Sequence, residues 1–206
     1  MDAGLDASTA IVIGSKHGQS PRDRTLLFKP AEHTLLDALT AAGIEVAYST
    51  GDTVEIIYLL DSTRAQQAAQ ILTDLNNTAC VTTTTTCWYG RMRGVYWGDS
   101  LATIGLAPPA QDPRMPDVVV DTQPGVIVDG SKAKLSEHGG FSAFDDRSVG
   151  LLVASPALTS TAAGSRCAAP VLSKSVAPTI LALLGISPNS LAGVRHEGTP
   201  VLPCLA

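Results

Sequence analysis

The sequence predicts a layered α/β fold with a mostly parallel sheet. Short apolar runs rich in β-branched residues alternate with helical patterns, and short polar connections separate them. The chain has 206 residues, of which 45% are hydrophobic and 16% charged, so it can bury a sizeable core as one domain.

The elements follow from local signals. Leu35, Leu36 and Leu39 recur at helical spacing before Gly43, a residue typical of helix ends, and Asp61 is a typical N-cap for a second helix. We expect helices at 31–42, from 62 to about 75, at 100–105 and from 173 to 184. We expect strands at 10–13, 44–48, 54–60, 118–121, 125–128 and 149–154, the first of them buried. The region 78–116 holds both tryptophans and is predicted to be a cap or an insertion.

Composition excludes some classes of function. The net charge of −5 argues against a nucleic-acid polymer as partner, and no apolar run reaches the length of a membrane span, so we expect no membrane partner either. The first residues carry no apolar core of a signal peptide, which leaves the location unknown. The four cysteines are compatible with free or buried thiols, with disulfides, or with a zinc site.

Two histidines stand out. His17 follows the apolar run 10–14, and His138 lies in a glycine-rich loop before the strand at 149–154. A glycine follows each histidine and would let a backbone approach a bound ion or phosphate closely. Two strand-end histidines that meet in one crevice would form a metal or phosphate site.

These segments resemble the alkaline phosphatase superfamily, in its type I phosphodiesterase/nucleotide pyrophosphatase branch. The resemblance rests on Ser-Lys-His-Gly-Gln-Ser-Pro at 15–21, Glu-His-Gly-Gly-Phe at 137–141 and the closing helix 176–186, with Glu-Gly-Thr-Pro-Val-Leu-Pro at 197–203. It implies a three-layer α/β/α sandwich with a mostly parallel sheet, a single partial domain over 1–206, expected to lack its amino-terminal strands.

The resemblance also implies a function. Members hydrolyse phosphate mono- or diesters with two divalent ions, usually zinc, so the implied partner is a small phosphate ester. His17 and His138 match histidines on the two metals. Asp145 and Asp146 would then orient a ligand histidine, although a solvated pair in a turn is the other interpretation.

The chain also departs from the family pattern. Lys16 stands where the family usually has an aspartate ligand; it would point away or contact a substrate phosphate as a point charge. The family's nucleophile and remaining ligands come from segments upstream of position 10. We therefore expect no catalytic residue within this chain, weak or partial metal binding, and little or no activity in isolation.

Two hypotheses follow. One is a phosphate-ester hydrolase that upstream sequence would complete; the other is a truncated, non-catalytic homologue that binds a metal or an anion weakly or serves as an interaction module. Without the early strands, an exposed sheet edge would favour self-association.

Overall fold

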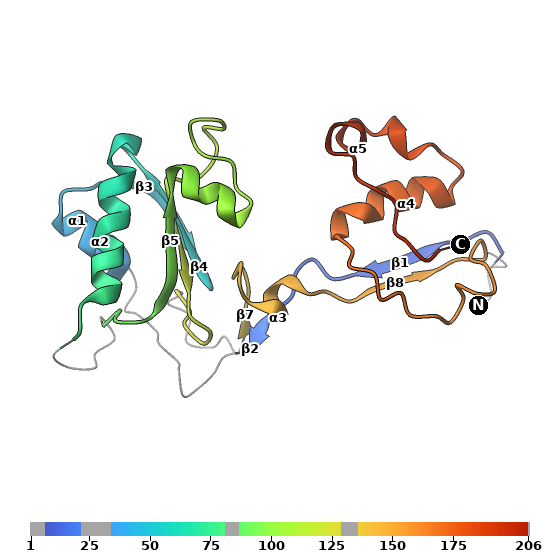
Figure 1. Cartoon of the computed structure of the whole chain (residues 1–206), viewed down its shortest axis with the longest axis horizontal. Coiled ribbons are helices and arrows are strands. Elements are labelled where there is room, and N and C mark those ends of the chain that lie inside the picture. Colours follow the sequence, from blue (N-terminus) through green and yellow to red (C-terminus); the bar gives the residue numbers. More distant parts are fainter. Residues whose placement is uncertain (1–6, 22–33, 81–86, 129–135, 206) are drawn as a thin grey trace. The chain divides into compact units, whose positions relative to one another are not determined.

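The structure is a computed structural model that describes residues 7–21, 34–80, 87–128 and 136–205. The chain divides into two compact units (Figure 1). The larger unit spans 17–148, and the smaller unit combines the first sixteen residues with 149–206. The prediction of a single domain over 1–206 stays a prediction.

A four-stranded antiparallel sheet forms the centre of the larger unit. Its strand order is β3-β4-β6-β5, and its strands are Val46–Gly51 (β3), Val54–Leu59 (β4), Met92–Trp97 (β5) and Val118–Thr122 (β6). Every strand pairing in the described ranges is antiparallel, so the expectation of a mostly parallel sheet is corrected. The physical reason is the connection between β3 and β4: two residues can join only antiparallel neighbours.

Helices α1 (Thr34–Ala41) and α2 (Ala65–Asn77) pack against each other, and α2 packs against β5 and β6 (Figure 1). Between the helices and the sheet lies the core, which includes Leu39, Ile57, Leu72, Trp88 and Val120. The Trp88 indole Nε1 donates to Thr34 Oγ1 at 2.9 Å, which satisfies the polar atom of a ring that is only 1% exposed.

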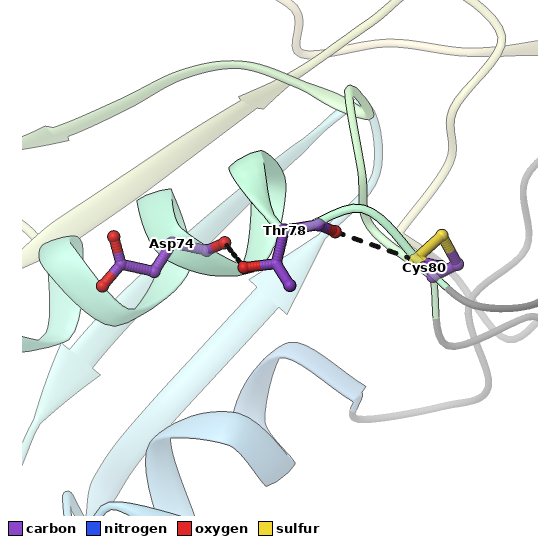
Figure 2. Close-up of a disulfide and its surroundings, with 4 residues drawn as sticks. Asp74, Thr78 and Cys80 are labelled. Carbon is purple, nitrogen blue, oxygen red and sulfur yellow. Dashed lines mark hydrogen bonds between the residues drawn. A yellow bond between two sulfur atoms is a disulfide. The ribbon is translucent and has the colours of Figure 1, made fainter.

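Both ends of α2 match local sequence signals. Asp61 accepts the Thr63 amide at 3.1 Å, and a short 3₁₀ turn (η1, Ser62–Arg64) leads into the helix. At the other end, the Thr78 hydroxyl donates to the Asp74 carbonyl at 2.6 Å (Figure 2). Cys80, just beyond, is joined to Cys87 by a disulfide. Of the three alternatives for the cysteines, the structure therefore has the disulfide.

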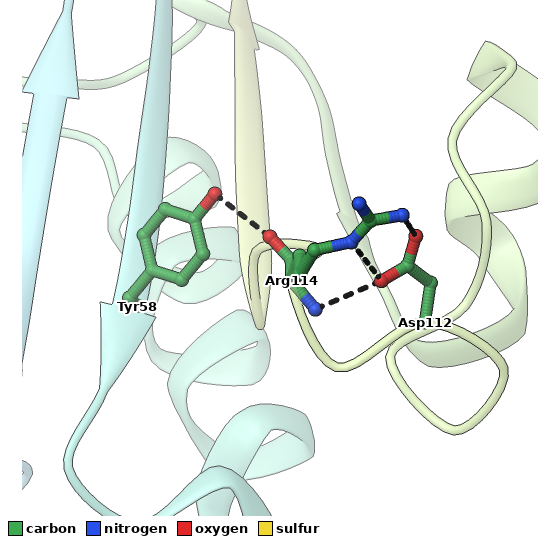
Figure 3. A network of polar contacts seen from close by, with 3 residues as sticks. All are labelled: Tyr58, Asp112 and Arg114. Atoms are coloured by element: carbon green, nitrogen blue, oxygen red, sulfur yellow. Dashed lines mark hydrogen bonds and ion pairs between the residues drawn. The ribbon is translucent and has the colours of Figure 1, made fainter.

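The predicted cap region contributes to the sheet itself. Within 78–116, β5 forms one edge of the sheet and continues into a 3₁₀ helix (η2, Gly98–Ile104) close to the predicted helix 100–105. In the loop that follows, Arg114 binds Asp112 through two guanidinium contacts of 2.9 and 2.7 Å, and its carbonyl accepts from the Tyr58 hydroxyl at 3.3 Å (Figure 3). Hydrogen bonds from Arg114 lower the pKa of the half-buried Asp112 carboxyl to about 2. These contacts fasten the loop to β4.

The smaller unit has a two-stranded antiparallel sheet of β1 (Ile11–Gly14) and β8 (Leu151–Ala154). Its helices are α4 (Val176–Leu183) and α5 (Ala192–Glu197), preceded by the 3₁₀ turns η3 (Ser173–Ser175) and η4 (Pro188–Ser190), and a disulfide joins Cys167 to Cys204. The buried Thr179 hydroxyl donates to the Ser175 carbonyl and accepts the Leu202 amide, which holds the carboxyl-terminal segment on α4.

Strand β1 is exposed rather than buried, contrary to expectation. Ile11 is 52% and Ile13 is 59% exposed. The reason is that β1 pairs only with β8 among the described residues, and a two-stranded ribbon covers neither of its own faces. Self-association through this edge stays a prediction. None of the helices in the described ranges has the length and apolar character that a membrane crossing requires.

Candidate metal centre

The two histidines singled out in the sequence lie side by side in the larger unit. The rings of His17 and His138 are stacked, with centroids 3.6 Å apart and planes inclined by 26°. Two short strands bring their loops together: β2 (Ser20–Pro21) pairs antiparallel with β7 (Ser136–Glu137). The imidazoles of His17 and His138 therefore lie together in the fold, as expected from the sequence.

The turn of the β3–β4 hairpin is attached to the same place. The Thr53 amide donates to the His138 carbonyl at 3.3 Å, and the Asp52 side chain turns toward the histidine. Asp52 Oδ2 lies 3.9 Å from His138 Nε2. A carboxylate thus faces an imidazole nitrogen, an arrangement suited to sharing either a proton or a cation.

A group of potential metal ligands results. Ligand atoms of Asp52, Glu137 and His138 all lie within 4.8 Å of one another. Glu137 is only 3% exposed, whereas Asp52 and His138 are half-buried. Two carboxylates that approach this closely with little water around them repel each other, and a bound cation would offset that repulsion. Nitrogen and oxygen donors of these types are ones that zinc accepts, so this donor set fits a zinc ion.

His17 stacks on His138 but is not one of these three potential ligands. Its Nδ1 is 2.8 Å from the Gly18 carbonyl oxygen. A carbonyl can only accept, so in the neutral ring Nδ1 carries the proton and Nε2 keeps a lone pair. Metal-binding histidines are commonly oriented by such a bond to the backbone.

Asp146 ties the loops of the site together. This aspartate lies in the short helix α3 (Phe144–Arg147) and is 7% exposed. Its carboxylate accepts three hydrogen bonds: from Ser20 Oγ at 2.5 Å, Thr53 Oγ1 at 3.0 Å and the Gly140 amide at 2.7 Å. One side chain therefore binds the loop after His17, the hairpin turn and the loop after His138.

Two further buried acids surround the site. Burial raises the pKa of Glu55, on β4, to about 7; a hydrogen bond from Ser49 opposes the shift and the charge of Asp52 adds to it. Burial also raises the pKa of Asp121, on β6, although the Ser142 hydroxyl donates to it at 2.9 Å. Both shifts favour the neutral form of these acids, whereas the charge of Asp52 at the hairpin turn favours a cation there.

Comparison with known proteins finds a similar fold but no matching family. No protein-family model matches the sequence, and a search of the curated proteins finds no match. The fold is similar to a solved structure of human ectonucleotide pyrophosphatase/phosphodiesterase 5. The TM-score is 0.57 and the sequence identity 16%, with 90% of this chain and 43% of that chain covered. The chain therefore spans less than half the length of that protein, and at this identity the likeness concerns the fold alone.

The other residues singled out in the sequence are not among these potential metal ligands. Lys16 belongs to the smaller unit and is exposed, and its contact with a substrate phosphate stays a prediction. Asp145 is exposed next to the buried Asp146. The roles of both aspartates beside a metal-bound histidine stay predictions. Asp52 was missed, because an aspartate in a turn between two strands is an ordinary turn former.

The glycine after His17 is required by packing within the protein. The Gly18 amide donates to the Asp146 carbonyl at 3.0 Å, and a Cβ at position 18 would overlap the main chain of Asp145. A Cβ at Gly140 would lie 2.7 Å from Asp146 Oδ2. The close approaches at Gly18 and Gly140 thus join loops within the protein, and the approach to a bound ion or phosphate expected of the glycines after His17 and His138 stays a prediction.

Replacing Gly18 by alanine is expected to destabilise the larger unit by about 2 kcal/mol, because one of the two loops must move. Both tryptophans lie in this unit, so urea unfolding followed by tryptophan fluorescence measures the effect. Gly150→Ala is the matched control, since a Cβ there meets nothing within 4 Å. Equal unfolding midpoints for the two variants would contradict the packing argument.

Proposed function

We propose that the larger unit binds a divalent metal ion, zinc by its donor set, and that this chain is the metal-binding part of a hydrolase of small phosphate esters. The proposal is carried by one observation: the stacked pair His17 and His138 lies beside the carboxylates of Asp52 and Glu137. Residues from three separate loops converge there, and their side chains are all of metal-ligating types.

Each residue has a distinct part in this proposal. Asp52, Glu137 and His138 would hold the ion, and His17 would contribute to a second ion beside it, as the resemblance implies. A bound zinc ion would polarise a phosphoryl oxygen and offset the charge that develops on it. The chain's own residues supply the negative charge that retains the ion, and Asp146 keeps the three loops in place.

The class of reaction is supported by the fold. The similar structure is named as a nucleotide pyrophosphatase/phosphodiesterase, and the chain covers 43% of it. Phosphate-ester hydrolysis is therefore proposed for the protein as a whole, with a nucleophile from outside the segments described here. The alternative is a non-catalytic module that binds a metal or an anion, and the lysine at position 16 in place of an aspartate favours it.

Zinc binding to the purified chain tests the proposal. We expect competition with a chelator dye to show one or two zinc ions bound, and His138→Ala to weaken the first of them at least tenfold because one of its ligands is lost. Asp52→Asn should weaken the same ion, since an amide carries no charge to offset the metal.

His196→Ala is the matched control, because His196 is an exposed histidine in the smaller unit. It should bind zinc like the original chain. Unchanged zinc affinity in His138→Ala, or an equal loss in His196→Ala, would refute the site. Hydrolysis of bis(p-nitrophenyl) phosphate by the zinc-loaded chain, abolished by His138→Ala, would decide against the non-catalytic alternative.

A further inference from the structure

A cavity of about 620 Å³ lies in the larger unit, at the end of β4 opposite to the hairpin turn. Tyr58 and Leu59 line it from β4, and Trp97 lines it from the end of β5. We propose that this cavity binds a guanidinium group on a short apolar stem, the chemistry of an arginine side chain. The inference does not depend on the metal centre, because none of the described residues that line the cavity is a proposed metal ligand.

The wall of the cavity contains a buried carboxylate. It belongs to Asp117, which is only 6% exposed. Its Oδ2 accepts the Leu59 amide at 2.7 Å. Within the described part of the chain, Oδ1 has no hydrogen-bond partner and the carboxylate has no ion pair. A buried charge is costly unless it is paired and hydrogen-bonded, so a cationic donor that enters the cavity would stabilise this carboxylate.

The described residues that line the cavity supply no such cation. There is no lysine, arginine or histidine among them, whereas the exposed Asp99 adds a second carboxylate. Arg114 belongs to the loop before β6, but its guanidinium is bound to Asp112 (Figure 3). The charge at the cavity is therefore negative and favours a cationic ligand over a neutral or an anionic one.

An aromatic ring lines the same cavity as the buried carboxylate. Trp97 pairs with Val118, the residue that follows Asp117, where β5 and β6 lie side by side. The tryptophan is 36% exposed, so its ring is accessible to a ligand. A guanidinium is planar and weakly hydrated, and it stacks on aromatic rings while its N–H groups donate to a carboxylate. An ammonium group is a compact, strongly hydrated point charge, so the ring and the carboxylate together favour a guanidinium.

The rest of the wall offers apolar surface to the stem of such a ligand. The apolar side chains include those of Leu59, Pro108 and Met115. The Tyr58 hydroxyl donates to the Arg114 carbonyl at 3.3 Å and so attaches the loop that carries Pro108 and Met115 to β4 (Figure 3). A wall fixed in this way loses little freedom when a ligand binds, and an alkyl stem against it is removed from water.

Butylguanidinium, butylammonium and butylurea provide the test, because they share the stem and differ in the head group. We expect calorimetric titration of the chain to show butylguanidinium bound at least tenfold more tightly than the neutral butylurea, with or without zinc. Butylammonium should bind about threefold more weakly than butylguanidinium. Asp117→Asn keeps an acceptor for the Leu59 amide and should reduce the affinity for butylguanidinium at least tenfold. Trp97→Leu, at a partly exposed side chain, should reduce it about threefold.

Asp145→Asn is the matched control, because it removes the same charge from an exposed aspartate that does not line the cavity. It should bind butylguanidinium like the original chain. Equal affinities for butylguanidinium and butylurea, or an affinity that survives both substitutions in the cavity, would overturn the inference.

An alanine-based peptide with one central arginine separates the two sources of such a group. Binding as tight as that of butylguanidinium assigns the cavity to arginine side chains of a polypeptide. If butylguanidinium binds and the peptide does not, the ligand is a small free guanidinium compound.

Discussion

Asp146→Ala is expected to destabilise the larger unit by about 3 kcal/mol. The substitution removes a buried carboxylate that accepts two hydroxyl groups and one amide, and hydrogen bonds to charged groups contribute about 1.5–3 kcal/mol each. The loss is less than the sum of three such bonds, because the Ser20 and Thr53 hydroxyls can rebond to water. Urea unfolding followed by tryptophan fluorescence measures the change.

Two comparisons make this prediction specific. Asp145→Ala changes an exposed aspartate in the same helix and should alter stability by less than about 0.5 kcal/mol. Asp146→Asn keeps one acceptor oxygen and should fall between the original chain and the alanine variant. If Asp146→Ala were no less stable than Asp145→Ala, the buried carboxylate would not join the loops as described.

Helix ends could be predicted because their signals are local. The N-cap Asp61 and the helix-ending Gly43 are recognised within a few residues of the position where they act. The predicted helices at 31–42 and from 62 to about 75 correspond to α1 and α2, apart from residues 31–33, which lie outside the described part of the chain.

Strand direction could not be predicted, because it depends on contacts between distant residues. The predicted strand at 44–48 ends before residues 49–51, yet these residues continue β3, since β4 supplies hydrogen-bonding partners for them. The turn is therefore two residues long, and β3 and β4 are forced to be antiparallel. The apolar run at 10–13 similarly predicted a buried strand. A strand is buried only where other parts of the chain cover its faces, and in the described residues Ile11 and Ile13 are more than half exposed.

The sequence revealed only some residues of the candidate site. His17 and His138 could be found because each precedes a glycine in a loop next to an apolar strand. Asp52 carries no such signal, and it reaches His138 only because the Thr53 amide binds the His138 carbonyl. The expectation of weak or partial metal binding counted only the two histidines, and Asp52 and Glu137 are further potential ligands.

The stability of the larger unit is expected to fall as the pH rises from 5 to 8, and Glu55→Gln should remove most of this fall. Glu55 is 5% exposed, and burial raises its pKa from 4.5 to about 7. The folded state therefore holds this proton more tightly than the unfolded state does. The resulting stabilisation is complete below pH 4.5 and is lost as the pH rises through about 7.

The magnitude follows from the shift in pKa. A difference of this size corresponds to about 3 kcal/mol between acid and alkaline pH. Glutamine is neutral throughout and matches glutamate in shape, so Glu55→Gln should be more stable than the original chain at pH 8 by up to about this amount. Urea unfolding in a metal chelator, at several pH values, measures it. Glu45→Gln, at an exposed glutamate just before β3, should keep the original pH dependence.

Zinc links this titration to the proposed site. The charge of Asp52 is one cause of the raised pKa of Glu55, so a cation bound at Asp52 should lower that pKa. In zinc, the fall in stability between pH 5 and 8 should therefore become smaller in the original chain but not in His138→Ala. If zinc left the pH dependence of the stability unchanged in both proteins, the charge next to Asp52 would not have changed. No ion would then bind next to Asp52.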